Sequence, residues 1–306
     1  MAKPRWDLPL PNYERDVNST RRVYRSALQE VIGIIESLST HGKSTNAISK
    51  AQLNSVKEQL SATLIGLDAE IDGIITDSVG RAFVNGQGET ILALGDADSL
   101  QAAIAGASMS ELATTTSKAL IADTFEDLLF ANNKMKRETI KMVRNIAAEQ
   151  MKTTVVAGQG VNYTKKKIVE RFREQGDIAI VDNLGRKWKL ERYSEMVTRT
   201  KLMQAHVEGT RTEALERGVD LAIISSHGAT DACSGFEGQI ISMNGTTEGY
   251  MTYDELRRSN LIFHPNCKHK ITPLRDTSLL PDNVLRKFEN GRQSAENRLK
   301  SAKRNK

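Results

Sequence analysis

The sequence contains few cysteines and few aromatic residues. Its 306 residues include two cysteines, Cys233 and Cys267, which cannot build the disulfide framework of a small secreted domain. Aromatic residues make up 5% of the chain, while 39% is hydrophobic and 26% is charged, a balance typical of helix-rich proteins rather than of β-sandwiches. The low cysteine content therefore favours synthesis in a reducing cytoplasm, and the composition favours helices.

Long apolar runs are also missing. Segment 1–16 carries charges throughout and has no apolar core of signal-peptide length, and no uncharged stretch approaches the roughly 18 apolar residues that a membrane span needs. We therefore expect a soluble protein that is not secreted and has no membrane contact. The length allows about two domains and at least one substantial core.

Positive charge is concentrated after residue 100. Residues 1–100 hold 10 Lys and Arg against 13 Asp and Glu, whereas residues 101–306 hold 33 against 25. A basic region of this size could neutralise DNA phosphates without reading base sequence, or it could consist of ordinary solvated side chains. Both interpretations remain open.

Apolar residues recur at helical spacing in three segments of the first half, 24–38, 53–74 and 125–146. Steps of three and four residues predict amphipathic helices, the first ending near His41 and Gly42. The apolar stripes could pack on one another, which we favour, or against a partner subunit as a coiled-coil seam. The glycines between Gly80 and Ser110 predict short elements joined by turns.

The second half of the sequence predicts a mixture of strands and helices. Apolar runs at 178–181 and 221–224 are typical of strands, and they flank an expected helix from Leu190 to Gly218. After residue 281 the chain is polar and basic, either a flexible tail or a helix ordered by contact. We therefore predict an α+β fold with a helical assembly region at 1–157, a small mixed α/β domain at 158–280 and a basic tail at 281–306.

Potential metal ligands gather in the mixed domain. Three of the five histidines and both cysteines fall within 43 residues, namely His227, Cys233, His264, Cys267 and His269. Their nitrogen and sulfur donors are those that zinc prefers, and His264 and Cys267 have a plausible ligand spacing. The paired units of strong zinc signatures are absent, however, because a loop separates His227 from Cys233.

Two further interpretations of this cluster stay open. A Cys/His nucleophile would require Cys267 to be activated by His227 with Asp231 orienting the ring. The interpretation that we favour is structural: the polar side chains hydrogen-bond with one another and fix a loop-rich domain. We therefore expect no catalytic residue and no obligatory cofactor, with zinc as the one cofactor that the residues could bind.

Four segments in one order resemble phage minor capsid proteins related to the MuF-like head morphogenesis proteins. The segments are 182–200, 218–229, 236–240 and 265–273, and together they lie within residues 178–275. This sequence departs from the family pattern at Cys233, Phe236, Glu237 and Lys268, where we would expect histidine, tryptophan, glutamine and arginine. The residues that carry the match are Asp182, Gly185, Tyr193, Arg199, Thr200, His227, Gly238, Asn266, Cys267 and His269.

The resemblance implies a minor structural protein of a tailed-phage head, made in the host bacterial cytoplasm. It would act in head assembly at the portal vertex or the inner capsid surface, with the portal protein, the major capsid protein or both as partners, and not as an enzyme. Non-specific contact with packaged double-stranded DNA is a further hypothesis. The residues proposed for that contact are Lys134, Lys136, Arg137, Lys165, Lys166, Lys167, Arg298, Lys300, Lys303 and Arg304.

Two other functions are weighed against this one. The first is a metal-dependent or Cys/His hydrolase of phage assembly, which would need the cluster to converge in an open pocket. The second is a non-specific DNA-binding protein that is delivered with the genome.

Overall fold

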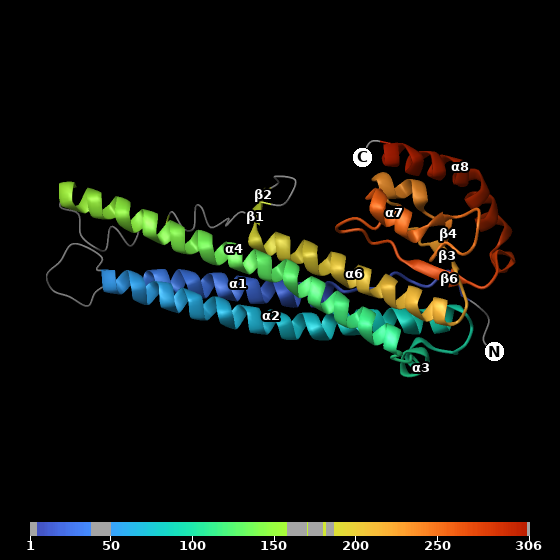
Figure 1. Ribbon diagram of the computed structural model, residues 1–306, viewed down its shortest axis with the longest axis horizontal. Helices are drawn as coiled ribbons and strands as arrows, with labels where there is room; N and C mark the ends of the chain where they lie inside the picture. The colour runs from blue at the N-terminus through green and yellow to red at the C-terminus, as the bar shows by residue number, and fades with distance from the viewer. Residues whose placement is uncertain (1–4, 38–49, 158–169, 171–179, 182–186, 305–306) are drawn as a thin grey trace. The chain divides into compact units, whose positions relative to one another are not determined.

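The computed structural model describes residues 5–37, 50–157, 170, 180–181 and 187–304 (Figure 1). Helices account for 69% of the structure, and a small mixed sheet lies in the C-terminal part. The predicted α+β class is therefore confirmed.

The chain forms two compact units, each assembled from separate stretches of sequence. The helical unit comprises Arg15–Ile74 and Thr124–Val197, and the sheet unit comprises Met1–Glu14, Ile75–Asp123 and Thr198–Lys306. Four helices cross the unit boundaries, which fall after Glu14, Ile74, Asp123 and Val197. The domain boundaries expected after residues 157 and 280 stay predictions.

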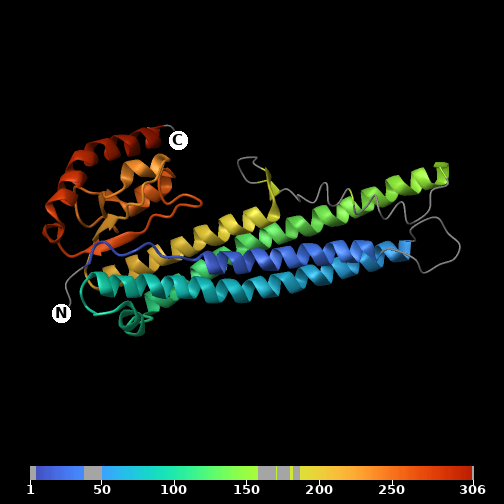
Figure 2. The same cartoon turned by 180° about the vertical axis from the view of Figure 1, so that it is seen from behind.

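The helical unit is a bundle of α1 (Glu14–Glu36) with the first part of α2 (Lys50–Ala93) and the later part of α4 (Glu111–Ala157), which run side by side in Figures 1 and 2. The apolar stripes face inward, so intramolecular packing is confirmed for the described residues. Burying each large aliphatic side chain contributes about 1.5–3 kcal/mol. The stripe includes Tyr24, Val31, Val56, Leu60, Leu64, Leu67, Ile71, Leu128 and Met135.

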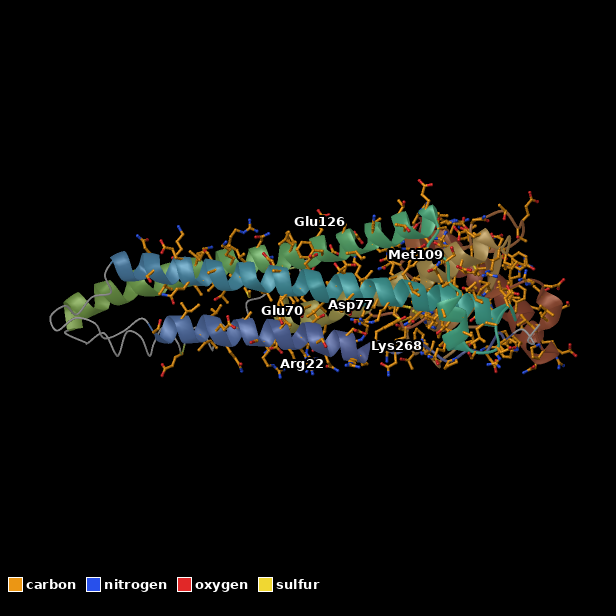
Figure 3. All side chains as sticks on the ribbon, turned by 90° about the horizontal axis from the view of Figure 1, so that it is seen from below. Arg22, Glu70, Asp77, Met109, Glu126 and Lys268 are labelled. Atoms are coloured by element: carbon orange, nitrogen blue, oxygen red, sulfur yellow. The ribbon has the colours of Figure 1, made fainter. Side chains whose placement is uncertain are left out.

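The outer faces of these helices are polar. Arg22, Glu70 and Glu126 are exposed, and Figure 3 shows the side chains of Arg22 and Glu126 directed away from the bundle. The described part of α1 ends at Glu36. The helix end expected at His41 and Gly42 lies outside the described residues.

The strand expected at 178–181 does not join the main sheet. Its described part, β1 (Ile180–Val181), pairs antiparallel with β2 (Lys187–Trp188) within the helical unit. A partner so close in sequence is reached at a small cost in loop-closure entropy. The next element, α6 (Leu190–Glu216), confirms the helix expected there.

The prediction of short elements from Gly80 onward is wrong for its first part, because α2 continues to Ala93. Gly86 of α2 and Gly209 of α6 face one another in the sheet unit. A Cβ atom on Gly86 would lie 2.0 Å from the backbone oxygen of His206, and one on Gly209 would lie 2.0 Å from that of Phe83. Glycine therefore permits a close helix crossing here. Turns and the short α3 (Leu100–Ala105) follow.

The sheet has the strand order β5-β4-β3-β6, with β4 (Ile240–Ser242) and β6 (Ile271–Leu274) both antiparallel to the central β3 (Leu221–Ile224). The edge strand β5 (Met251–Thr252) is parallel to β4. Alternate β3 residues face two cores, as strand geometry requires. Ala222 and Ile224 contribute to one core, and Leu221 and Ile223 to the other.

Helices surround this sheet. The short α7 (Tyr253–Ser259) begins at a capping box between Thr252 and Glu255, and the 3-10 turns η1 (Ala232–Phe236) and η2 (Thr277–Leu279) precede β4 and the last helix. That last helix is α8 (Asp282–Arg304), which buries Phe288, Ala295 and Leu299. Of the two alternatives for the basic tail, the structure therefore has the ordered helix.

Within the described ranges, every helix is too short or too polar to cross a lipid bilayer.

Candidate functional site

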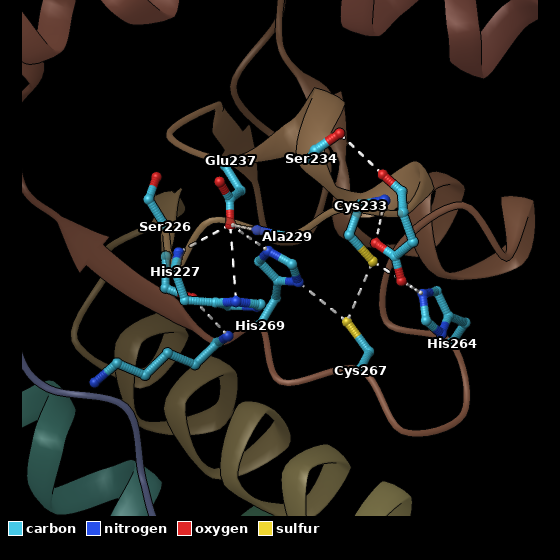
Figure 4. Close-up of polar contacts among 12 residues, drawn as sticks. Ser226, His227, Ala229, Cys233, Ser234, Glu237, His264, Cys267 and His269 are labelled. Atoms are coloured by element: carbon cyan, nitrogen blue, oxygen red, sulfur yellow. Dashed lines mark hydrogen bonds and ion pairs between the residues drawn. The ribbon is translucent and has the colours of Figure 1, made fainter.

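The histidines and cysteines of the mixed domain lie on two loops of the sheet unit (Figure 4). His227 follows β3, and Cys233 lies in η1. His264, Cys267 and His269 all belong to the loop between α7 and β6. Asp231 caps η1, since its carboxylate accepts a 3.0 Å hydrogen bond from the backbone N–H of Cys233.

The second loop is shaped by left-handed backbone conformations. Phe263 and Asn266 have φ angles of 58° and 64°, a region that costs a non-glycine residue energy and is sustained by its surroundings. The backbone N–H of Asn266 donates to Oγ1 of Thr200 at 3.0 Å, and Nη1 of Arg199 donates to its side chain at 3.4 Å. The structure therefore brings together Arg199, Thr200 and Asn266, three of the family-like residues.

The two thiols form the centre of the cluster. Sγ of Cys233 lies 3.7 Å from Sγ of Cys267 and 2.9 Å from Nε2 of His264. Sγ of Cys267 lies 3.2 Å from Nδ1 of His269. Both cysteines and His269 are buried. Four of the five candidate ligands are thus linked in one chain of contacts.

Glu237 organises the neighbouring side of the cluster. Its Oε1 atom accepts from the backbone N–H groups of His227 and Ala229 at 2.8 and 3.0 Å, and it lies 3.3 Å from Nε2 of His269. Burial alone would raise the pKa of Glu237, but these donors more than offset it and lower the pKa. The ring of His227 packs 4.3 Å from that of His269, centroid to centroid. Glu237 therefore accepts hydrogen bonds as a carboxylate.

The geometry does not favour a cysteine nucleophile. The imidazole beside Cys267 is that of His269, not of His227 as the catalytic interpretation requires. Burial raises the pKa of the Cys233 thiol, and the adjacent Cys267 raises it further. Burial also raises the pKa of Cys267. Because the thiolate is the nucleophile, these shifts oppose catalysis near neutral pH.

The remaining candidate residues lie outside the His/Cys cluster. Gly238 has a φ of 76°, which glycine adopts without strain. Tyr193 lies on α6 and belongs to the helical unit. The same unit contains three of the proposed DNA-contact residues on α4, namely Lys134, Lys136 and Arg137. Asp182, Gly185, Lys165, Lys166 and Lys167 lie outside the described residues. Arg298, Lys300, Lys303 and Arg304 lie on α8, where Lys303 pairs with Glu255 at 2.6 Å.

One buried polar network was not predicted. Lys270, next to His269, is 1% exposed and forms an ion pair with Glu89 of α2. The same carboxylate lies 3.3 Å from Nε2 of His206, whose Nδ1 contacts the hydroxyl of Tyr13 at 2.9 Å. All four residues belong to the sheet unit. Because they are far apart in sequence, no spacing pattern could have revealed them.

A second missed residue is Asp220, which directly precedes β3. Its carboxylate accepts hydrogen bonds from the hydroxyl of Ser242 at 2.6 Å and from the backbone N–H groups of Asn244 and Thr247, each at 2.9 Å. Burial would raise the pKa of Asp220, but these hydrogen bonds outweigh it and lower the pKa. Asp220 thus fixes the loop that follows β4.

Comparison with known families agrees with the resemblance found in the sequence. A family model described as phage minor capsid protein 2 matches residues 13–300, far more than the segments that first carried the likeness. No curated protein and no solved structure matches the chain. The match covers nearly the whole chain and includes both compact units. The chain therefore belongs to the phage minor capsid protein 2 family, as a structural component of a phage head.

Proposed function

We propose that this minor capsid protein acts in head assembly at the portal vertex or the inner capsid surface, where α8 contacts packaged double-stranded DNA. The observation that carries the DNA contact is the two-sided character of α8. One side buries Phe288, Ala295 and Leu299 in the sheet unit. The other side exposes basic residues, so the helix presents positive charge from a fixed scaffold.

The basic side of α8 suits phosphates rather than base edges. Arg298, Lys300 and Arg304 are exposed at its C-terminal end. Cations spaced along a helix can neutralise phosphates without regard to sequence.

Exposed apolar side chains support a protein partner. Met109 and Leu112 are 48% and 56% exposed near the start of α4. In the helical unit, Ile65 and Phe130 are 63% and 52% exposed. Apolar residues on an otherwise polar helix can insert into a partner's groove. We propose the portal protein or the major capsid protein as that partner.

The proposal assigns no chemical step to the protein. Its support is the burial of both thiols and the position of His269, rather than His227, beside Cys267, which oppose a Cys/His hydrolase. The His/Cys cluster then contributes to the shape of the domain.

DNA contact is tested by measuring the affinity of the purified protein for unrelated duplexes over a salt series. The variant Arg298→Gln/Lys300→Gln/Arg304→Gln should bind more weakly, and the slope of log affinity against log salt should fall by about 3, near one unit for each lost phosphate contact. The matched control Arg22→Gln/Lys57→Gln/Lys118→Gln removes three exposed cations from other helices. Equal losses in both variants, or no binding by the wild type at low salt, would contradict the α8 contact.

Position in the head is tested separately with a photo-reactive amino acid at Leu112, and at exposed Glu70 as a control. In assembled heads, the probe at Leu112 should cross-link to the portal or major capsid protein more strongly than the probe at Glu70. Cross-links only between copies of this chain would contradict a capsid partner. Loss of the protein from particles after genome ejection would instead favour delivery with the DNA.

A further inference from the structure

We propose that Cys233, His264, Cys267 and His269 bind one zinc ion in a closed structural site. The four residues supply two sulfur and two nitrogen donors, a ligand set that zinc binds with tetrahedral geometry. This inference is independent of the DNA contact and of the position in the head.

The spacing of the sulfurs agrees with a zinc ion. With Zn–S bonds of about 2.3 Å, two sulfurs of a tetrahedral site lie about 3.8 Å apart. The observed separation between Cys233 and Cys267 is 3.7 Å. The contact of Cys267 with Nδ1 of His269 is 3.2 Å and that of Cys233 with Nε2 of His264 is 2.9 Å, both shorter than the roughly 3.6 Å between sulfur and nitrogen in such a site. The two sulfurs are therefore already spaced for zinc, and binding requires the two nitrogens to move slightly away from them.

Both histidines already have the outer hydrogen bonds that zinc ligands need. A metal-binding imidazole usually donates its second N–H to a carboxylate or a backbone carbonyl, which fixes the ring. Nε2 of His269 lies 3.3 Å from the carboxylate of Glu237. Nδ1 of His264 lies 2.9 Å from the backbone oxygen of Pro265. In each ring the nitrogen that faces a thiol is the one left to bind the metal.

The fourth ligand, His264, has to move before all four residues can bind one ion. Cys233, Cys267 and His269 place their donor atoms within 4.8 Å of one another, whereas His264 groups with Cys233 and Asp231. Figure 4 shows His264 and His269 on opposite sides of the two sulfurs. Closing the site requires the His264 side chain to move toward Cys267. We choose His264 over Asp231 because structural zinc sites are built mainly from cysteine and histidine.

A bound ion would join two loops that are distant in sequence. Cys233 lies in η1, and the other three ligands lie in the loop that leads into β6. The strained Phe263 and Asn266 lie in that second loop. Metal binding of this kind contributes directly to folding free energy. The zinc would thus stabilise the contact between these two loops.

The test begins with full-length protein purified without chelator under reducing conditions, and zinc is measured by mass spectrometry. We expect about one zinc ion per chain. Replacement by cobalt should give the visible absorption of a tetrahedral ion together with a sulfur-to-cobalt charge-transfer band. The Cys267→Ser and Cys233→Ser variants should lose nearly all of the zinc, while His227→Asn should keep it as a matched control from the same pocket.

The fourth ligand is identified by comparing His264→Asn with Asp231→Asn. Loss of zinc in the first and retention in the second is the expected result. Retention in both would overturn the closed site, since an open coordination position would remain. Circular dichroism of each variant shows whether it folds, and the cobalt spectrum of the wild type tests thiolate ligation even where a variant does not.

Three other results would overturn the proposal. The wild type could contain no zinc and show no saturable uptake after titration, or Cys267→Ser could keep the ion. The two thiols could also prove to be oxidised to a disulfide in the reduced preparation, which a count of free thiols would show.

Discussion

The two compact units bury different kinds of side chain. The helical unit is held mainly by an aliphatic stripe, represented by Leu60, Leu64 and Ile71. The sheet unit also has apolar cores, but it buries Lys270 against Glu89 and encloses the His/Cys cluster. The stripe repeats along the sequence, whereas the polar contacts join residues that are far apart. The bundle is therefore specified by a local pattern of apolar residues, while the sheet unit depends on a few specific partners.

Substitutions in the two units should therefore destabilise the protein for different reasons. Loss of an aliphatic side chain removes a contribution that scales with buried volume. Loss of one member of a buried ion pair leaves a charge without compensation. The chain has two tryptophans, Trp6 in the sheet unit and Trp188 in the helical unit. Trp6 packs against an apolar core of the sheet unit, so its fluorescence can follow the unfolding of that unit.

The largest expected effect comes from Glu89→Ala. It leaves the buried ammonium of Lys270 without its carboxylate, so the free energy of unfolding should fall by about 3–5 kcal/mol. The loss should be seen with Trp6 as the probe during urea unfolding. The double variant Glu89→Leu/Lys270→Met should recover much of it, because two apolar groups need no partner. No recovery would show that the network matters for more than charge compensation.

A somewhat smaller loss is expected from Leu64→Ala in the helical unit. Leu64 is 2% exposed, and removal of its side chain should cost about 2–4 kcal/mol, measured by urea unfolding followed by circular dichroism. Its neighbour Ile65 is 63% exposed, so Ile65→Ala serves as the control and should change stability by less than about 0.5 kcal/mol. Similar losses in both variants would contradict the inward orientation of the stripe.

Two glycines of α2 should respond to alanine with opposite signs. Gly86→Ala forces a Cβ atom onto the backbone of α6 and should destabilise the sheet unit by about 1–3 kcal/mol. Gly80→Ala meets nothing within 4 Å and should stabilise the protein by about 0.5–1 kcal/mol through helix propensity. Thermal unfolding followed by circular dichroism measures both. Stabilisation by both variants would mean that the close crossing does not exist.

The helices were predictable because their information is local. Steps of three and four residues identified the stripe that contains Leu60 and Leu64, and the pattern of α6 was also recognised. The continuation of α2 beyond Gly80 was not predicted, since glycine in a single sequence is usually taken to indicate a turn. Only the facing Gly209, more than a hundred residues later, shows that Gly86 allows a close approach.

The sequence predicted which residues form the candidate site but not which of them contact one another. The sequence identified the five His and Cys residues, and the structure links four of them through contacts around Cys233 and Cys267. The sequence could not show that His269 rather than His227 lies beside Cys267, because this depends on how the two loops fold against one another. Glu237 entered the sequence comparison only as a departure from a family pattern, and its role as an acceptor depends on the fold.

The smallest expected effect is the pH-dependent one at Asp220. Its lowered folded-state pKa means that the ionised carboxylate stabilises the fold above the unfolded pKa of about 3.9, and that this contribution is lost as the pH falls further. Asp220→Asn should therefore cost about 1–2 kcal/mol at neutral pH, and the difference from wild type should shrink below about pH 4. Urea unfolding with Trp6 as the probe, repeated across this pH range, measures the difference. Asp98→Asn removes an exposed carboxylate of the same unit and should leave stability nearly unchanged. A difference for Asp220→Asn that stays constant down to pH 2 would show that its hydrogen bonds do not depend on the charge.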